Sequence, residues 1–271
     1  MTHSRTTIHA LLEANGLAPS RALGQNFVAD ANTVRRMARL ADVGDGDLVL
    51  EIGAGLGSLT LALVETGARV IAVEVDRHLI EPLREVVEPL GVVVRHDDAS
   101  TMDVAAVTGG RPCVVVANLP YNVATSLVLG ILESQPLVSR LLVMVQREVA
   151  ERLAASAGDD AYGAASLRVQ YFADAVVVGR VSANVFVPRP KVESALVAIT
   201  RRERVRIDPS VVGEADLFAL VRTAFGQRRK MLRRSLADWA SEGVFERAGV
   251  AATKRPEELS LEEFARLAAA R

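Results

Sequence analysis

The sequence predicts a doubly wound α/β fold with a mostly parallel sheet, followed by a small all-helical domain. Two observations predict the sheet. Short runs rich in Val, Ile and Leu alternate with helical stretches over about the first 200 residues, a pattern typical of βαβ units. The runs are continuous rather than alternately polar, which indicates strands covered on both faces. A third observation predicts the helical domain, because this pattern stops near residue 205.

Each predicted strand is a short hydrophobic run, and a helical stretch at 124–134 comes before the fifth. The seven runs are 47–53, 69–75, 91–97, 113–119, 140–146, 175–181 and 195–201. Beyond them, residues 214–225 and 228–240 have the spacing of amphipathic helices. We therefore predict a first domain over 1–205 and a helical domain over 206–271.

Composition narrows the class of protein. Half of the 271 residues are hydrophobic, and the formal net charge is -1. The single cysteine, Cys113, excludes an intramolecular disulfide framework and a cysteine-cluster zinc site, which fits a reducing cytoplasm. The amino-terminal residues lack the apolar core of a secretory signal. The longest uncharged stretch, between Arg111 and Glu133, contains Asn and Pro and is typical of strand, loop and helix, so we expect no membrane contact. Taken together, these features predict a soluble, cytoplasmic protein. Nothing in the sequence calls for more than a monomer.

Polar and glycine residues follow four successive predicted strands. The first ends in a G-x-G-x-G run at 53–57, the second in Glu74, the third in Asp97 and Asp98, and the fourth in Asn118-Leu119-Pro120-Tyr121. In an open parallel sheet, ligands bind at the carboxyl ends of the strands. Glycines there allow a close approach to a ligand, and an acidic residue 21 positions after Gly53 is placed to bind ribose hydroxyls. Taken alone, the glycine run is consistent with a turn and Glu74 with a solvated strand end, and the Asn118–Tyr121 motif fits a buried strand end closed by a proline turn better than a catalytic site. The ordered set predicts a nucleoside-containing cofactor.

This ordered set resembles the class I methyltransferases that use S-adenosylmethionine (SAM), and N-L-P-Y resembles their adenine-N6 branch. More narrowly, the chain resembles the bacterial 16S rRNA adenine N6,N6-dimethyltransferase family (KsgA/RsmA). Ala54 departs from that family, which usually has proline there. The matching segments, in the family's order, are LGQNFVAD (23–30), EIGAGLGSLT (51–60), VEVD (73–76), DDA (97–99), NLPYNV (118–123), MVQREVA (144–150), NVFVPRPKVES (184–194) and AFGQRRKMLRRSL (224–236).

The resemblance implies that SAM is the methyl donor and leaves as S-adenosylhomocysteine. The residues that it places around SAM are Asn26, Val28, Gly53, Glu74, Asp98 and Asn118. The strand-end pattern independently supports Gly53, Glu74 and Asp98. Asn26 and Val28 rest on the resemblance alone, because residues 25–27 otherwise indicate only a loop that leads into a helix.

The Asn118-Leu119-Pro120-Tyr121 motif suits transfer of a methyl group to an exocyclic amine. The adenine N6 is a poor nucleophile, and two acceptors, the Asn118 side-chain oxygen and the Leu119 carbonyl, would aim its lone pair. Pro120 fixes the turn, and Tyr121 offers a stacking surface for the base. We hypothesise an in-line displacement driven by orientation, with no metal and no covalent intermediate. Phe186 is a candidate for the other face of a flipped base; the alternative is a core residue that anchors a proline-rich crossing loop.

Charge is unevenly distributed along the chain. Residues 180–234 contain 13 basic and five acidic residues, so the segment carries +8 and the remainder -9. Concentrated positive charge is expected of a phosphate-binding surface. On a continuous helix, the last four basic residues would share one face; a solvated helix face is the alternative. The candidate RNA-binding residues are Arg222, Arg228, Arg229, Lys230, Arg233 and Arg234.

The resemblance implies dimethylation at N6 of two adjacent adenosines in a stem-loop of small-subunit rRNA, within a pre-ribosomal particle, and a role in ribosome biogenesis. One alternative is a large-subunit rRNA adenine methyltransferase of the macrolide-resistance type, although Leu119 and Gly24 resemble the small-subunit branch more. Another is an assembly factor that acts mainly by binding. A small-molecule methyltransferase is the third, and it explains neither the basic segment nor the added helices.

Overall fold

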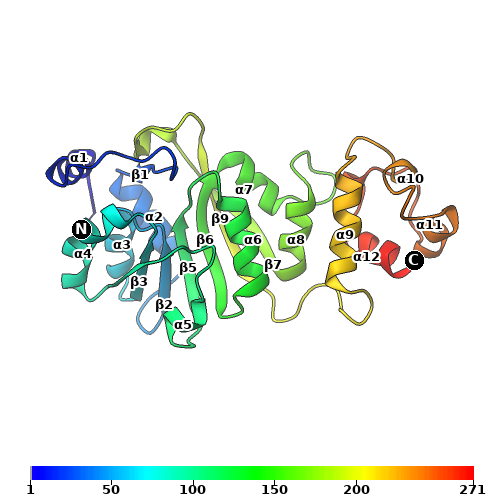
Figure 1. Ribbon diagram of the computed structural model, residues 1–271, viewed down its shortest axis with the longest axis horizontal. Helices are drawn as coiled ribbons and strands as arrows, with labels where there is room; N and C mark the ends of the chain where they lie inside the picture. The colour runs from blue at the N-terminus through cyan, green and yellow to red at the C-terminus, as the bar shows by residue number, and fades with distance from the viewer. Residues whose placement is uncertain (1) are drawn as a thin grey trace. The chain divides into compact units, whose positions relative to one another are not determined.

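The computed structural model describes residues 2–271 and divides the chain into two compact units (Figure 1). The first comprises residues 1–150 and 176–201, and the second comprises 151–175 and 202–271. The second unit thus takes in a segment from the middle of the chain, which the sequence pattern did not associate with the carboxyl-terminal helices. Among the described residues, no helix is long and apolar enough to cross a membrane.

The first unit is built on a seven-stranded sheet with the order β4-β3-β2-β5-β6-β9-β7. Strands β2 to β6 pair in parallel, whereas β9 is antiparallel to β6. All seven predicted strands are confirmed, and their order reverses between β2 and β5, where ligands bind in such sheets. The strands are β2 (Leu48–Ile52), β3 (Arg69–Glu74), β4 (Val93–His96), β5 (Cys113–Asn118), β6 (Val138–Gln146), β7 (Ala173–Val181) and β9 (Ser194–Arg201).

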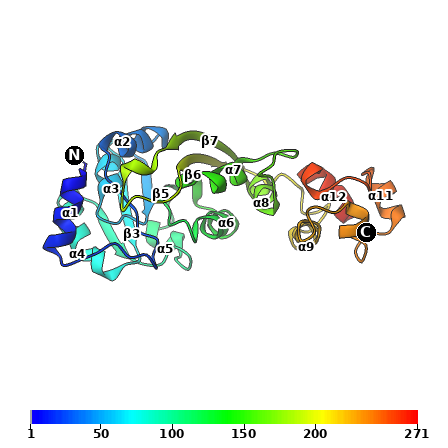
Figure 2. The same cartoon turned by 90° about the horizontal axis from the view of Figure 1, so that it is seen from above.

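Helices cover both faces of this sheet, as the continuous hydrophobic runs predict. Every residue of β2 is buried, and one core cluster joins strand residues to α2, α3 and α4. In Figure 2, α2 and α6 lie on opposite faces. The helices up to residue 154 are α1 (Arg5–Ala14), α2 (Ala31–Leu40), α3 (Ser58–Val64), α4 (Arg77–Val87), α5 (Val104–Thr108), α6 (Ala124–Ser134) and α7 (Arg147–Ala154), with a 3-10 turn η1 (Glu88–Leu90).

A second, two-stranded sheet was not predicted. Strand β1 (Phe27–Val28) pairs antiparallel with β8 (Phe186–Val187), just after the 3-10 turn η2 (Ala183–Val185). The partners are far apart in sequence and each is two residues long, so neither has a strand pattern of its own. This pairing holds the amino-terminal segment against residues 184–193, the crossing segment that precedes β9.

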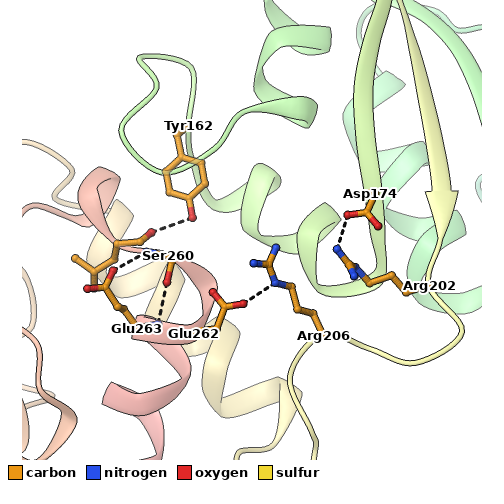
Figure 3. A network of polar contacts seen from close by, with 8 residues as sticks. Tyr162, Asp174, Arg202, Arg206, Ser260, Glu262 and Glu263 are labelled. Carbon is orange, nitrogen blue, oxygen red and sulfur yellow. Dashed lines mark hydrogen bonds and ion pairs between the residues drawn. The ribbon is translucent and has the colours of Figure 1, made fainter.

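The second unit is helical apart from the first residues of β7, and its helices pack through aromatic side chains. The Tyr171 and Phe218 rings meet edge to face at 5.4 Å, and Phe225 lies 6.2 Å from Tyr162. The Tyr162 hydroxyl donates to the Leu259 carbonyl (2.9 Å), and Arg206 donates to Glu262 (2.6 Å; Figure 3). Its elements are α8 (Ala164–Phe172), α9 (Glu214–Phe225), α10 (Leu232–Ser235), α11 (Glu242–Ala248), η3 (Pro256–Glu258) and α12 (Leu261–Ala269).

The helix predicted over 228–240 is wrong over most of its length. Residues 227–230 form turns, and α10 is only four residues long. The physical reason is a competing set of backbone bonds, because the Leu232 and Arg233 amides donate to the Lys254 and Ala252 carbonyls. Arg229 and Lys230 therefore do not share a helix face with the arginines of α10.

Candidate active site

Two adjoining cavities open at the carboxyl ends of the strands, both within the first unit. Their volumes are about 70 and 450 Å³, and Leu23, Gly53 and Pro120 line both. The smaller is bordered by the β2–α3 turn, the end of β3, the loop after β5 and the amino-terminal segment. The larger extends past the end of β4 to α6. Six residues were expected around SAM. Five of them line the smaller cavity (Asn26, Val28, Gly53, Glu74 and Asn118), and the sixth, Asp98, lines the larger.

The β2–α3 turn requires its glycines. Gly55 has a φ of 58°, and a Cβ there would lie 3.1 Å from the Phe27 ring. At Gly57, with a φ of 86°, a Cβ would lie 2.9 Å from Val87 Cγ1. At both positions the positive φ strains any residue other than glycine, and the space for a side chain is tight. The turn thereby brings the amino-terminal segment directly over the end of β2.

Glu74 is buried at the end of β3. Its carboxylate accepts hydrogen bonds from the amides of Gly55 (2.8 Å), Val75 (3.0 Å) and Asp76 (3.0 Å). Burial raises the pKa of Glu74, and these three donors oppose the rise. A carboxylate has about four acceptor positions, so one remains for a hydroxyl in the cavity.

Glu51 is a site residue that the sequence interpretation missed. This β2 carboxyl is 1% exposed, lines the smaller cavity, and its Oε2 has no hydrogen-bond partner. Burial raises its pKa to about 8, opposed chiefly by a hydrogen bond from the Thr60 side chain; nearby Glu74 adds to the rise. Neither Thr60 Oγ1 nor Glu51 Oε2 has a well-formed hydrogen bond in the described residues, so burial dominates the pKa of Glu51. The available signal was a charged residue inside an otherwise apolar strand.

Asp98 differs from the two glutamates because it is exposed. It lies just beyond β4, where its Oδ1 accepts from the Ser100 amide (2.8 Å) and hydroxyl (2.7 Å). The Ser100 amide and hydroxyl lower the pKa of Asp98, so the carboxylate is charged at neutral pH. Its second oxygen remains an acceptor for an amino group in the larger cavity.

The segment 23–28 lies across the strand ends. The Gln25 side chain donates to Asp76 Oδ2 (2.7 Å), and the Asn26 carbonyl accepts from Asn118 Nδ2 (2.9 Å). The Asn26 side chain donates to the Gly24 carbonyl (3.0 Å). Gln25 had no role in the sequence interpretation, and the contact with Asp76 could not be inferred from either residue alone.

The Asn118 amide has a fixed orientation. Because its nitrogen donates to Asn26, its Oδ1 is the atom left to accept a hydrogen bond from a ligand. The Leu119 amide donates to the Met144 carbonyl (3.0 Å), which ties the loop to β6. The Tyr121 hydroxyl lies 2.8 Å from Ser194 Oγ at the start of β9. The motif thus presents one side-chain oxygen and one aromatic ring at the cavity.

Phe186 lies elsewhere. Its side chain is fully buried in the core cluster that includes Val28, its partner in the β1–β8 pair, and it lines neither cavity. This burial favours the core-anchor alternative over base stacking.

The candidate RNA-binding residues are all exposed and all in the second unit. Arg228 donates to the Asp160 carbonyl (2.7 Å) and pairs with Glu257. Other basic residues of the +8 segment serve the fold: Arg201 donates to four carbonyls at the end of α6 and the start of β6. The basic segment is also divided between the two units after residue 201.

The cavity residues fit SAM. Glu51 and Ser58 both line the smaller cavity, and each has a buried polar atom without a partner in the described chain. Buried polar atoms are normally hydrogen-bonded, so these two mark a place where a polar ligand is expected. Carboxylates also suit hydroxyl and amino groups such as those of SAM.

Comparisons with known proteins identify the family of the chain. A family model described as "Ribosomal RNA adenine dimethylase" matches residues 18–270. The chain is 45% identical to ribosomal RNA small subunit methyltransferase A of Streptomyces coelicolor, over 96% of this chain and 94% of that protein. It is 46% identical to the protein of that name in Leifsonia xyli, over 97% and 96% of the two chains.

Solved structures share the fold. A dimethyladenosine transferase from Plasmodium falciparum matches with a TM-score of 0.73 at 24% identity, over 88% of this chain and 94% of that one. The 23S rRNA methyltransferase ErmE matches with a TM-score of 0.72 at 24% identity, over 89% and 98%.

Proposed function

The chain belongs to the ribosomal RNA adenine dimethylase family and is therefore a SAM-dependent rRNA adenine methyltransferase, and we propose that it dimethylates N6 of two adjacent adenosines in a stem-loop of small-subunit rRNA. The observation that carries this proposal is the Asn118 amide, whose oxygen is left free at the cavity by the bond of its nitrogen to Asn26. The small-subunit assignment is supported by the relatives at 45–46% identity.

The role of Asn118 follows from its fixed amide. Bound SAM supplies an electrophilic methyl group on a sulfonium. The Asn118 Oδ1 and the Leu119 carbonyl accept the two N6 hydrogens, so that the nitrogen lone pair is held toward the donor. Holding reactants in this way converts a bimolecular encounter into an oriented one. The N6 proton leaves after the methyl group has been transferred.

Cofactor binding is assigned to the strand ends. Glu74 binds the ribose hydroxyls and Asp98 the adenine amino group, while Gly53 leaves room for the methionine part. Asn26 and Val28 close the site from the amino-terminal segment. All of these residues line the two cavities, which supports the assignment.

We assign RNA docking to the exposed basic residues of the second unit and methyl transfer to the predicted 1–205 domain. On this account the 206–271 helices contribute phosphate contacts. The substrate is small-subunit rRNA within a pre-ribosomal particle, and the enzyme acts as a cytoplasmic monomer with a role in ribosome biogenesis.

The test is methyl transfer from labelled SAM to purified small and large ribosomal subunits that lack adenine dimethylation. We expect label in small-subunit rRNA, recovered as N6,N6-dimethyladenosine. Label confined to the large subunit would instead support the macrolide-resistance type of activity. This chain shares its fold with the 23S rRNA methyltransferase ErmE.

The assembly-factor alternative has its own test. An Asn118→Ala variant should bind immature small subunits as the unaltered protein does while transferring no methyl groups. If that variant also restores subunit assembly in cells that lack the gene, binding rather than methylation is the main function.

A further inference from the structure

The side chain of Tyr121 is held from outside its own loop. Its hydroxyl lies 2.8 Å from Ser194 Oγ, and Ser194 is fully buried at the first residue of β9. The ring, by contrast, is only partly buried and borders the smaller cavity. One end of the side chain is therefore anchored while the side chain borders the cavity.

Sheet topology explains how residues 73 positions apart meet. Tyr121 follows β5, and the order of the neighbouring strands is β5-β6-β9. Because β9 is antiparallel to β6, its first residue lies at the same edge as the carboxyl ends of β5 and β6. Ser194 itself is paired with Gln146 in the β6–β9 ladder, so the sheet fixes its position.

The chemistry of the hydroxyl indicates anchoring rather than proton transfer. Burial raises the pKa of Tyr121, with the Ser194 bond opposing the rise, so the phenol stays neutral at physiological pH. One of the two hydroxyls donates to the other, so a single hydrogen bond joins the phenol to Ser194. A ring restrained in this way loses little further conformational freedom when a base stacks on it.

We infer that Ser194 is a positioning residue that holds the Tyr121 ring as a preformed stacking surface for the target adenine. This inference rests on the proposed function, in which Tyr121 stacks on the base. Ser194 is also where the crossing segment 184–193 rejoins the sheet, so the bond links that segment to the loop that carries Asn118 and Tyr121.

The test is a double-mutant cycle on the full-length protein, with unmethylated small subunits and SAM. Ser194→Ala and Tyr121→Phe remove the same hydrogen bond from opposite ends, and Tyr121→Ala removes the ring. Ser166→Ala is the control, because Ser166 is equally buried but its hydroxyl donates to the Arg152 carbonyl in the second unit.

We expect Ser194→Ala and Tyr121→Phe each to raise KM for the subunits about three- to tenfold, the effect of one hydrogen bond. The value of kcat and the SAM affinity measured by calorimetry should stay within about twofold, because stacking acts equally on bound substrate and transition state. The double variant should match either single variant, since both remove one interaction. Tyr121→Ala should raise KM more than these variants do, by roughly five- to 100-fold relative to the unaltered protein.

Distinct outcomes would overturn distinct claims. If Tyr121→Ala raises KM but Ser194→Ala and Tyr121→Phe do not, stacking stands and the role of Ser194 is wrong. Additive losses in the double variant would also overturn it, because the two residues would then act independently. An unchanged KM in Tyr121→Ala would overturn the stacking role and this inference with it. Should Ser194→Ala fail to fold, Tyr121→Phe tests the same bond from the loop side.

Discussion

The strand-end site of the first unit and the basic surface of the second unit are built in opposite ways. In the former, most polar groups are buried or half-buried and joined by short bonds: Glu74 to three amides, and Asn118 to Asn26. In the latter, cationic side chains such as Arg233 and Arg234 are exposed on a four-residue helix. On the proposed function, the first surface would select a ligand by geometry and the second by charge.

This difference predicts two kinds of response to mutation. Loss of one buried group misplaces its neighbours, so effects at the strand ends should be large and specific to one step. Loss of one exposed arginine removes a screened charge, so effects on the basic surface should be modest, cumulative and dependent on salt.

The largest effect is expected at Asn118. Replacement by Ala removes the proposed acceptor for N6, and misplacement of a reacting group costs about 100-fold or more in rate. SAM affinity should change by less than about fivefold. Single-turnover methyl transfer and calorimetry measure the two, with Asn15→Ala, a helix-end amide outside both cavities, as control. Retention of more than a tenth of the rate would contradict the proposed role and remove the distinction between the two surfaces.

The next effect concerns the buried carboxyl of Glu51. Because its folded-state pKa of about 8 lies above the ordinary value of 4.5, the unliganded protein should lose stability as pH rises from about 5 to 8. The slope is up to about 1.4 kcal/mol per pH unit. Glu51→Gln should lack this slope, so the variant gains on the unaltered protein toward pH 8.

Urea unfolding across pH 5 to 8 measures this difference, with the exposed Glu81→Gln as control. A stability difference between Glu51→Gln and the unaltered protein that stays constant with pH would show that Glu51 is not held protonated by burial.

On the basic surface, a smaller effect is expected. Arg233→Ala together with Arg234→Ala should weaken subunit binding about tenfold at low salt. The slope of log affinity against log salt should fall by about 1 to 2. Arg84→Ala is the control, since Arg84 is paired with Glu81 and Glu88 in the first unit. An unchanged salt slope would exclude these two arginines from the docking surface.

The smallest effect is expected at Asp98, the one exposed member of the cofactor set. Asp98→Ala should weaken SAM binding about three- to tenfold through loss of one hydrogen bond. Ser100→Ala removes a contact within the turn but keeps the carboxylate, and should have less effect. Equal losses in the two variants would assign the role to the turn rather than to Asp98.

The same contrast explains what could be predicted from the sequence. The seven strands, and the meeting of Gly53, Glu74 and Asn118 at one edge, follow from a parallel topology that the hydrophobic runs already indicate. Asn26 required the family resemblance, because its place at the cavity depends on the β1–β8 pair, which has no local pattern.

Features set by distant contacts could not be predicted. The helix expected around Arg229 and Lys230 gives way to turns because the Leu232 and Arg233 amides pair with the 252–254 loop. Nothing in the sequence indicated that part of α7 and all of α8 belong with the carboxyl-terminal helices. The role of Glu51 could have been predicted, since a lone charge in an apolar strand indicates a special environment.

The proposed mechanism requires the Asn118 amide, oriented by the Asn26 carbonyl, to present its oxygen to adenine N6. The most direct measurement is a crystal structure of the protein with S-adenosylhomocysteine and adenosine. We expect N6 to lie about 2.7–3.2 Å from Asn118 Oδ1, with Asn118 Nδ2 still bonded to Asn26. An adenosine whose N6 contacts Asn118 Nδ2, or lies beyond hydrogen-bond distance of Asn118, would contradict it.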